Sequence, residues 1–313
     1  MLYFNLADKL LSKAYLFRRI VTLSIEEFDV LVEKLEPEWQ EREQERLMSR
    51  KNRKNAIGQG RPYELGSFKN LLLVTVIYLR TSIGYEFLAL LFNIDSSTVK
   101  RVIRRTMPLL QDRFIPKTAL TKRKKRINTL DEFLEEYPDL KDVIVDGTEF
   151  ASKRPKKRQQ QSYSGKKKRH TKKVQIARDK NTGLIVGVSP PAKGKIHDKK
   201  QLERTGWDDK LPDNINRWGD LGYQGMEDDP NDASSWIIPY KGSKNYPLTK
   251  KQKRVNKQIS KERVKVEHSI RGIKIFRRLG ETLTIKTDEL LFNSVLAAAN
   301  LVNFKILVRQ GIS

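Results

Sequence analysis

The sequence of 313 residues contains no cysteine. Disulfide bonds and zinc sites built on cysteine are therefore excluded, which fits a reducing compartment. Long hydrophobic runs are missing too, because the longest one, LLLVTVIYL at 71–79, is too short to cross a bilayer. The first residues do not have the basic region, clean apolar run and small-residue cleavage site of a secretory signal. We expect a soluble protein that acts where it is made.

Acidic residues are scarce relative to basic ones. The chain has 38 Asp and Glu against 63 Lys and Arg, which leaves a formal net charge of +25. Such a surplus favours a polyanionic partner. Nucleic acid is the usual one, because each neutralised phosphate releases counterions. An anionic membrane surface is the main alternative, but no long basic amphipathic helix supports it.

The first third of the chain has helical patterns. Residues 24–48 are rich in Glu, and Ser24 with Glu27 fits a capping box that opens a helix. Residues 50–66, which combine basic residues with Gly and Pro, indicate a loop or linker. From residue 67 to about 110, apolar residues recur at helical spacing, so several helices are expected there.

One pair of these expected helices, within IGYEFLALLFNIDSSTVKRVIRR at 83–105, has the pattern of a helix-turn-helix. A turn at 92–94 would separate them, and Asp95 or Ser96 would cap the second helix. Val99, Val102 and Ile103 would face inward. Four basic residues would remain on the outer side to face phosphates: Lys100, Arg101, Arg104 and Arg105. An ordinary helical hairpin with a solvated basic face is the alternative.

After residue 141 the pattern changes from helical to strand-like. Short runs rich in β-branched residues predict three successive strands, over 142–150, 172–180 and 184–192. A helix over 196–207, a strand ending at Gly219–Asp220, a short strand over 234–240 and helices from about residue 250 follow. We therefore expect three regions: a helical and linker region at 1–60, a helix-turn-helix domain at 61–126, and an α/β domain at 140–313.

Two aspartates lie at expected strand ends of the α/β domain. Asp146 follows VIV, where the first strand is expected to leave the sheet, and Asp220 follows a later strand in RWGDLGYQG. Burying an acid there is costly, so its presence requires a reason. Either one alone is typical of a turn or cap. Two of them in a strongly basic domain indicate a functional site.

A third acid, Glu267, lies among six basic residues in RVKVEHSIRGIKIFRR. On a helix, Glu267, Arg271 and Lys274 share one face, and Val266, Ile270 and Ile273 form the neighbouring apolar stripe. Three converging carboxylates would bind Mg²⁺ or Mn²⁺ through oxygen. Two such ions activate a water or a 3′-hydroxyl for attack on a phosphodiester. The alternative is an ion pair between Glu267 and Arg271, which contributes only about 0.2–0.5 kcal/mol.

The order Asp146, Asp220, Glu267 resembles that of the DDE transposases of bacterial insertion sequences, most closely the insertion-sequence-five family and its Harbinger-like relatives. The resemblance extends from about residue 24 to 307 and rests on VDGTEF, YSGKKKRHTKKVQ, the HD of GKIHDKKQL, GDLGYQG and RVKVEHSIRGIKIFRRL, with the helix-turn-helix before them. It implies an RNase H-like catalytic domain, a mixed sheet flanked by helices. It also implies that the three acids bind two metal ions, and that a dimer or larger complex brings two DNA ends together in the nucleoid-associated cytoplasm.

Further residues are expected to hold DNA near this site. Residues 153–173 contain 11 Lys and Arg and no acid, which indicates a DNA-backbone surface or, alternatively, a disordered basic loop. The expected contacts are Lys166, Lys167, Lys168, Arg169, His170, Lys172, Tyr223, Arg271, Lys274, Arg277 and Arg278. Asp198 after His197 is expected to cap a helix rather than bind metal. Glu149 would point across the strand from Asp146.

Two other functional classes remain open from the sequence. A helix-turn-helix regulator that has lost catalysis would need the basic surface but not three acids in it. A basic RNA-associated structural protein would not need them either. The acids therefore favour a transposase that cuts DNA and joins 3′-hydroxyl ends to target DNA.

Overall fold

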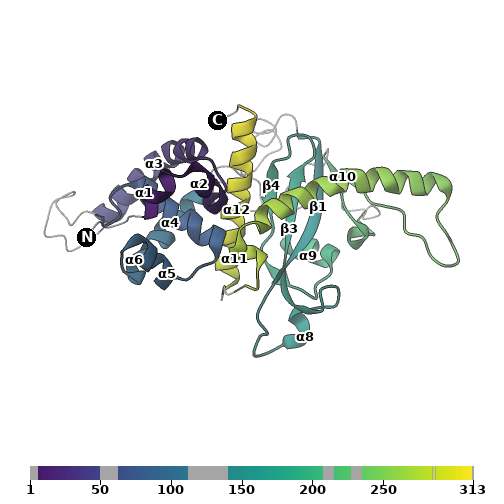
Figure 1. The fold of residues 1–313 in the computed structure, drawn as a ribbon. Coiled ribbons are helices and arrows are strands. Elements are labelled where there is room, and N and C mark those ends of the chain that lie inside the picture. The colour runs from purple at the N-terminus through teal and green to yellow at the C-terminus, as the bar shows by residue number, and fades with distance from the viewer. Residues whose placement is uncertain are drawn as a thin grey trace.

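The computed structural model describes residues 6–49, 63–111, 140–206, 215–226, 235–283, 285 and 287–311. Within them, a helical half is followed by a half built on a sheet (Figure 1). Most of the predicted linker at 50–66 lies outside the described residues.

The helical half begins with three helices and continues with the helix-turn-helix. The elements are α1 (Leu6–Leu11), α2 (Ala14–Val21), α3 (Ile25–Met48), α4 (Phe68–Thr81), α5 (Tyr85–Phe92), α6 (Ser96–Thr106) and the 3₁₀ turn η1 (Met107–Leu110). The predicted capping box is confirmed: Ser24 Oγ accepts from the Glu27 N–H at 3.1 Å, and Glu27 Oε2 accepts from the Ser24 N–H at 2.7 Å. The apolar run at 71–79 is buried throughout α4, so it forms the core of this half.

The sheet begins with the three predicted strands and continues with two parallel ones. Its strands of three or more residues are β1 (Asp142–Ala151), β3 (Arg169–Asp179), β4 (Ile185–Val188), β6 (Asn216–Trp218) and β7 (Ser235–Ile237). β3 pairs antiparallel with both β1 and β4, whereas β6 runs parallel to β1 and β7 parallel to β6. Beyond β4, β3 also pairs with β2 (Tyr163–Ser164), which follows α8 (Gln159–Ser162), and with β5 (Ala192–Lys193). The order along the sheet is β2–β3–β1–β6–β7, and β4 and β5 pair with β3 off this path.

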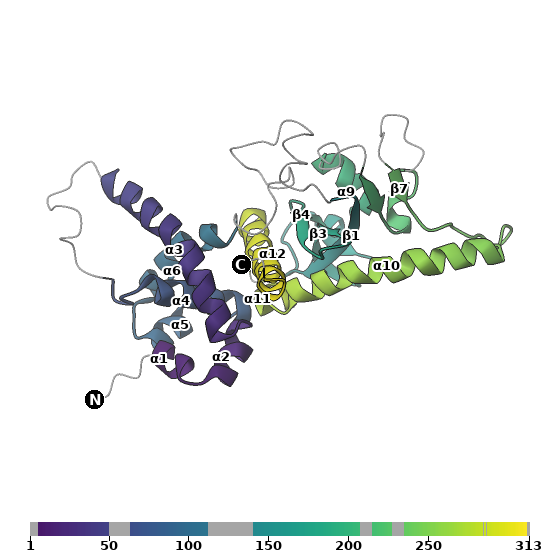
Figure 2. The ribbon, with the colours of Figure 1, turned by 90° about the horizontal axis from the view of Figure 1, so that it is seen from above.

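Helices cover both faces of this sheet, as Figure 2 shows. α9 (Asp198–Thr205) lies on one face, where Val143 and Val145 of β1 enter one apolar cluster. α10 (Lys250–Lys274) and α12 (Asp288–Arg309) lie on the other face, where Ile144 enters a second cluster shared with the helical half. The short α11 (Arg277–Gly280) packs against α4. The predicted α/β fold, a mixed sheet flanked by helices and preceded by a helix-turn-helix region, is confirmed.

The last helix, α12, is a core helix. Within the described ranges it alone is long and apolar enough to span a membrane, with 22 residues and a mean hydropathy of 1.6, but 61% of its apolar window is buried. It contacts η1 and α3 of the helical half as well as β4 and α10. Its Asn303 amide accepts from the Ile185 N–H and donates to the Ile185 carbonyl, both at 2.8 Å. The helix therefore pairs with the backbone of β4 as a neighbouring strand would.

Candidate active site and nucleic-acid surface

Asp146 lies in the middle of β1. It is paired with Ile176 of β3, and the strand continues to Ala151. The prediction that the first strand leaves the sheet at Asp146 was therefore wrong, because β3 is long enough to pair with β1 over its whole second half. The parallel pairing of β1 with β6 ends earlier, at Ile144. Asp146 thus lies just beyond the end of its parallel neighbour.

Asp220 comes two residues after β6, which ends at Trp218 and so slightly before the predicted end at Gly219–Asp220. It caps the 3₁₀ turn η3 (Leu221–Tyr223), where its Oδ1 accepts from the Gly222 N–H at 2.7 Å. Because β1 and β6 are parallel, the carboxyl end of β6 opens on the edge where Asp146 lies. The two aspartates are brought together by this geometry: each has an oxygen 3.8 Å from the same guanidinium nitrogen of Arg263.

Arg263 of α10 supplies the positive charge between the two aspartates. Its side chain is about four-fifths buried. Burial raises the pKa of Asp146 to about 6, and the nearby charges of Asp220 and Asp198 act in the same direction, while Arg263 and the Gly147 N–H oppose the rise. A carboxylate whose pKa is shifted by burial and by neighbouring acids is typical of a functional site. The sequence had not singled out Arg263.

Glu267 is exposed, one helical turn beyond Arg263 on α10. The apolar stripe predicted beside it is confirmed, because Val266, Ile270 and Ile273 are buried. In the described part of the chain, no three His, Asp or Glu side chains lie close enough to hold a metal ion. Glu267 therefore remains a predicted ligand.

The donor set of the two aspartates fits a hard divalent cation. Both offer carboxylate oxygens, and one oxygen of each lies 3.8 Å from the same Arg263 nitrogen. Mg²⁺ is commonly held by one or two carboxylates together with substrate phosphates.

A further acid, Asp198, approaches the aspartate pair from the opposite face of the sheet. It is the first residue of α9, and it forms an ion pair with Lys173 at 3.1 Å. A Cβ at Gly147 would lie 2.4 Å from one Asp198 oxygen, and a Cβ at Gly222 would lie 3.0 Å from the other. Both glycines are therefore needed for the close approach of this carboxylate. The signal in the sequence is the HD pair before the helix, which favours a cap, although the His197 side chain accepts no capping hydrogen bond.

The basic turn between β2 and β3 presents the expected cations to solvent. Lys166, Lys167, Lys168 and Arg169 are all exposed. The two residues after them are more constrained: His170 packs edge-on against Tyr163, and Lys172 forms an ion pair with Asp288 at 2.9 Å. Glu149 accepts from the Thr171 hydroxyl at 2.6 Å.

The structure corrects one expected DNA contact and constrains two others. Tyr223 is fully buried, stacked on Trp236, and its hydroxyl accepts from Gln175 at 2.9 Å. Burial raises its pKa well above the usual value, and the residue belongs to the core beneath the site.

The other expected contacts on α10 and α11 differ in their exposure. The Arg278 guanidinium lies 4.3 Å from the centre of the Tyr78 ring. Lys274 donates to the Glu149 carbonyl at 3.1 Å, and its pKa is lowered by burial. Arg271 and Arg277 are exposed.

The helix-turn-helix has the predicted division between core and surface. α5 ends at Phe92, and Asn93 adopts a left-handed conformation with φ of 51° in the turn. Val99, Val102 and Ile103 of α6 are buried, as predicted. Asp95 occupies the N-cap position, but its side chain makes no capping hydrogen bond. Of the outer cations, Lys100, Arg101 and Arg104 are exposed, while Arg105 donates to the Tyr63 hydroxyl at 3.2 Å.

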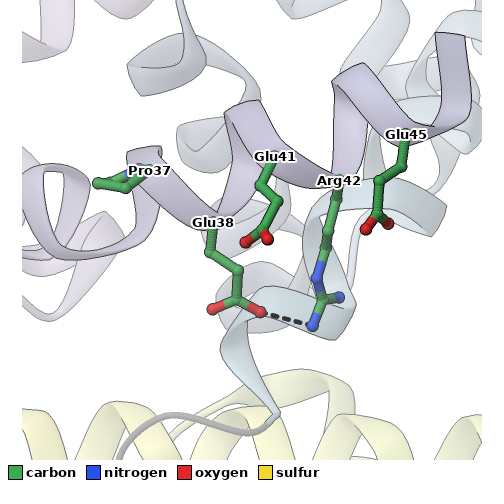
Figure 3. A pocket seen from close by; sticks show the side chains of 5 residues that line it. All are labelled: Pro37, Glu38, Glu41, Arg42 and Glu45. Carbon is green, nitrogen blue, oxygen red and sulfur yellow. Dashed lines mark ion pairs between the residues drawn. The ribbon is translucent and has the colours of Figure 1, made fainter. Parts of the chain in front are cut away.

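A hollow on α3 has the opposite charge. Figure 3 shows the side chains that line it, which are Pro37, Glu38, Glu41, Arg42 and Glu45. Arg42 pairs with Glu38 at 2.5 Å. Glu41 and Glu45 have no such counter-ion in the lining, which therefore carries a net negative charge. Such a surface repels phosphates, so this hollow is not a candidate site for DNA.

Comparisons with known proteins agree with this architecture. The family described as "DDE superfamily endonuclease" matches residues 145–303, just over half of the chain, and a family described as its helix-turn-helix matches residues 63–116. The chain therefore belongs to the DDE superfamily endonucleases, and the predicted resemblance is confirmed.

Two relatives point the same way. A protein of Microchaete diplosiphon, named as a transposase for insertion sequence element IS702, is 29% identical over 66% of this chain and 70% of its own length. A protein of Streptomyces albus G, named as a transposase for insertion sequence element IS112, is 27% identical over 72% of this chain and 75% of its own length.

Proposed function

We propose that this protein is the transposase of an insertion sequence: it binds the ends of its element, cleaves phosphodiester bonds there and joins the 3′-hydroxyl ends to target DNA. The observation that carries the proposal is the pair of aspartates on β1 and after β6, both facing one point beside α10 in a domain of the DDE endonuclease family. The names of the two relatives support transposition over other endonuclease functions.

In this proposal Asp146 and Asp220 hold Mg²⁺ or Mn²⁺, and Glu267 completes the set of ligands. Glu267 is four residues beyond Arg263, whose side chain already reaches both aspartates from the same helix face. Bound divalent cations supply an activated water or 3′-hydroxyl and stabilise the leaving oxygen. The protein contributes by positioning charges: the pairing of β1 with β3 and the Gly147 N–H fix Asp146, and the Gly222 N–H fixes Asp220.

The basic surfaces divide the contacts with DNA between them. α6 would bind the ends of the element through Lys100, Arg101 and Arg104, while the exposed turn at 166–169 holds the backbone beside the active site. Cutting two ends together requires a dimer or a larger complex, and such a protein works in the nucleoid-associated cytoplasm. The boundaries 1–60, 61–126 and 140–313 assign these tasks to separate domains.

The alternative is a helix-turn-helix regulator without catalysis. Such a protein would retain α6 and its cations, and it would gain nothing from two aspartates kept together at a cost in burial. Burial first, and the neighbouring Asp220 to a smaller extent, raise the pKa of Asp146, so a charged carboxylate is unfavourable there, and this supports the enzyme.

Mg²⁺-dependent nicking of DNA that carries the element's ends tests the proposal. Wild type is compared with Asp146→Ala, Asp220→Ala and Glu267→Ala, with Glu262→Gln as the matched control. Glu262 lies on the same helix but pairs with Lys265 at 2.6 Å. We expect each alanine variant to lose at least about 100-fold in rate, because electrostatic groups at such sites contribute about 3 kcal/mol or more.

The outcomes separate the function from the site. If the wild type cuts nothing, the enzyme assignment is wrong and the regulator is favoured. If Glu267→Ala cuts as well as Glu262→Gln while both aspartate variants are inactive, Glu267 is not the third ligand. Retained DNA binding by all variants shows that they are folded.

A further inference from the structure

A basic arm projects from the catalytic half. It consists of residues 240–261, which form the loop before α10 and the first half of that helix. Figures 1 and 2 both show this half of α10 extending beyond the sheet. The arm contains eight basic residues and no acid, and all eight are exposed: Lys241, Lys244, Lys250, Lys251, Lys253, Arg254, Lys257 and Lys261.

The arm is an ordered element. The side chain of Asn256 clamps the loop to the helix, accepting from the Tyr240 N–H at 2.8 Å and donating to the Tyr240 carbonyl at 2.9 Å. Thr249 and Gln252 form a capping box at the start of α10. Eight like charges on an ordered element repel one another, which is unfavourable unless an anion neutralises them. None of the eight forms an ion pair within the described residues.

The cations of the helical part form a ridge. Lys250, Arg254, Lys257 and Lys261 are spaced by four, three and four residues, so they lie along one side of α10. The buried residues Ile259 and Val266 lie on the opposite side of the helix, so the ridge faces solvent. The arm is continuous with the part of α10 that carries Arg263, so DNA bound beside the aspartates is within reach of the arm.

An aromatic ring lies at the tip of the arm. Tyr246 is 82% exposed, although its turn is fixed by two hydrogen bonds with Ser243, at 3.0 and 3.1 Å. Exposed aromatic rings among cations are typical of nucleic-acid surfaces, where they pack against the faces of nucleotides.

We propose that this arm is a DNA-binding surface that holds the phosphate backbone beside the site of cleavage. The proposal rests on the proposed function for the nature of the partner. At 1.5 Å per residue, the 13 residues from Lys250 to Arg263 span about 20 Å. At 3.4 Å per base pair, the arm reaches DNA about six base pairs from the cleaved bond.

The salt dependence of DNA binding tests the arm. We compare wild type with a triple variant, Lys250→Gln, Arg254→Gln and Lys257→Gln, by fluorescence anisotropy on a 40-base-pair duplex of arbitrary sequence in EDTA. A control triple, Lys13→Gln, Arg18→Gln and Arg19→Gln, removes the same charge from exposed positions near α2. Each lost phosphate contact makes the negative slope of log K against log salt less steep by about 0.9. The slope of the arm variant should therefore be less steep than that of wild type by about 2.7.

The test separates the arm from the enzyme. An arm variant whose slope equals that of the control triple overturns the proposal, even if the wild type nicks DNA normally. If the wild type cuts nothing but binds DNA with a steeper salt dependence than the arm variant, the arm is a DNA-binding surface and the proposed function is wrong. Tyr246→Ala should weaken DNA binding about fivefold or more without changing the slope, since the ring is neutral. An unchanged affinity would show that Tyr246 does not contact DNA.

Substrate length tests the position of the arm. On duplexes that end about twelve base pairs beyond the cleaved bond, the arm variant should have a raised KM for nicking. On duplexes that end about three base pairs beyond it, wild type and variant should converge. Equal impairment on both lengths would place the contact elsewhere.

Discussion

The guanidinium of Arg263 lies 3.8 Å from a carboxylate oxygen of Asp146, so a cation from α10 faces the middle of β1. The same nitrogen lies 3.8 Å from Asp220. Both distances exceed a hydrogen bond, and the contacts are therefore electrostatic. Arg263 acts as an internal counter-ion that makes two neighbouring acids tolerable in one place.

Removing this counter-ion should strengthen the binding of divalent cations. We expect Arg263→Gln to bind Mn²⁺ about tenfold more tightly than wild type in the absence of DNA, because a positive charge near both carboxylates competes with the ion. Isothermal titration calorimetry measures the affinity directly, with Arg254→Gln as an exposed control on the same helix. Weaker binding by Arg263→Gln would show instead that Arg263 orients the aspartates.

The raised pKa of Asp146 predicts a loss of stability as pH rises. A carboxyl whose pKa is about 6 in the fold and 3.8 as its ordinary value binds a proton more tightly when folded, so its stabilising effect is present below pH 4 and lost through pH 6. Between pH 4.5 and 7.5 this amounts to roughly 2 kcal/mol. Urea unfolding in EDTA at both pH values should show that Asp146→Asn removes this part of the pH dependence. An identical pH dependence in the two proteins would contradict the assigned pKa.

Much of the fold could be predicted from local patterns. The β-branched runs at 142–150 and 172–180 form strands because alternating or continuous apolar side chains match two covered sheet faces, whereas the run at 184–192 forms a strand only over Ile185–Val188. The apolar stripe of α10 was visible at helical spacing. What could not be predicted was where each strand lost its partner: Asp146 is followed by five more paired residues because β3 is long.

The missed site residues depend on tertiary packing. Arg263 reaches the aspartates because of the rotation of α10 on the sheet, which no local pattern encodes. Asp198 comes from the other face through the space left by Gly147, a contact between residues 51 positions apart. Tyr223 follows Asp220 closely in sequence, yet η3 directs its ring into the core against Trp236.

The link between α12 and the edge of the sheet should be sensitive to the Asn303 amide. Asn303→Ala leaves the N–H and the carbonyl of Ile185 without their amide partner, and each buried group left unpaired costs about 1–3 kcal/mol. We expect the free energy of unfolding in urea to fall by about 2–4 kcal/mol. Asn245→Ala, at an exposed position, should change it by about 0.5 kcal/mol or less. Equal effects of the two substitutions would show that the amide pairing does not stabilise the fold.

The outer face of α6 should decide which DNA is bound. Lys100→Gln and Arg104→Gln each remove one exposed cation from the helix that the family match assigns to the helix-turn-helix. If a residue contacts a phosphate, its loss weakens binding to all sequences and lowers the salt slope by about 0.9. If it reads a base, preference for the element's ends over unrelated duplexes falls by about 1–3 kcal/mol. Competition binding with both duplexes across a salt series distinguishes the two roles, with Lys13→Gln as the control. Wild-type affinity, slope and preference in both variants would show that this face of α6 does not bind DNA.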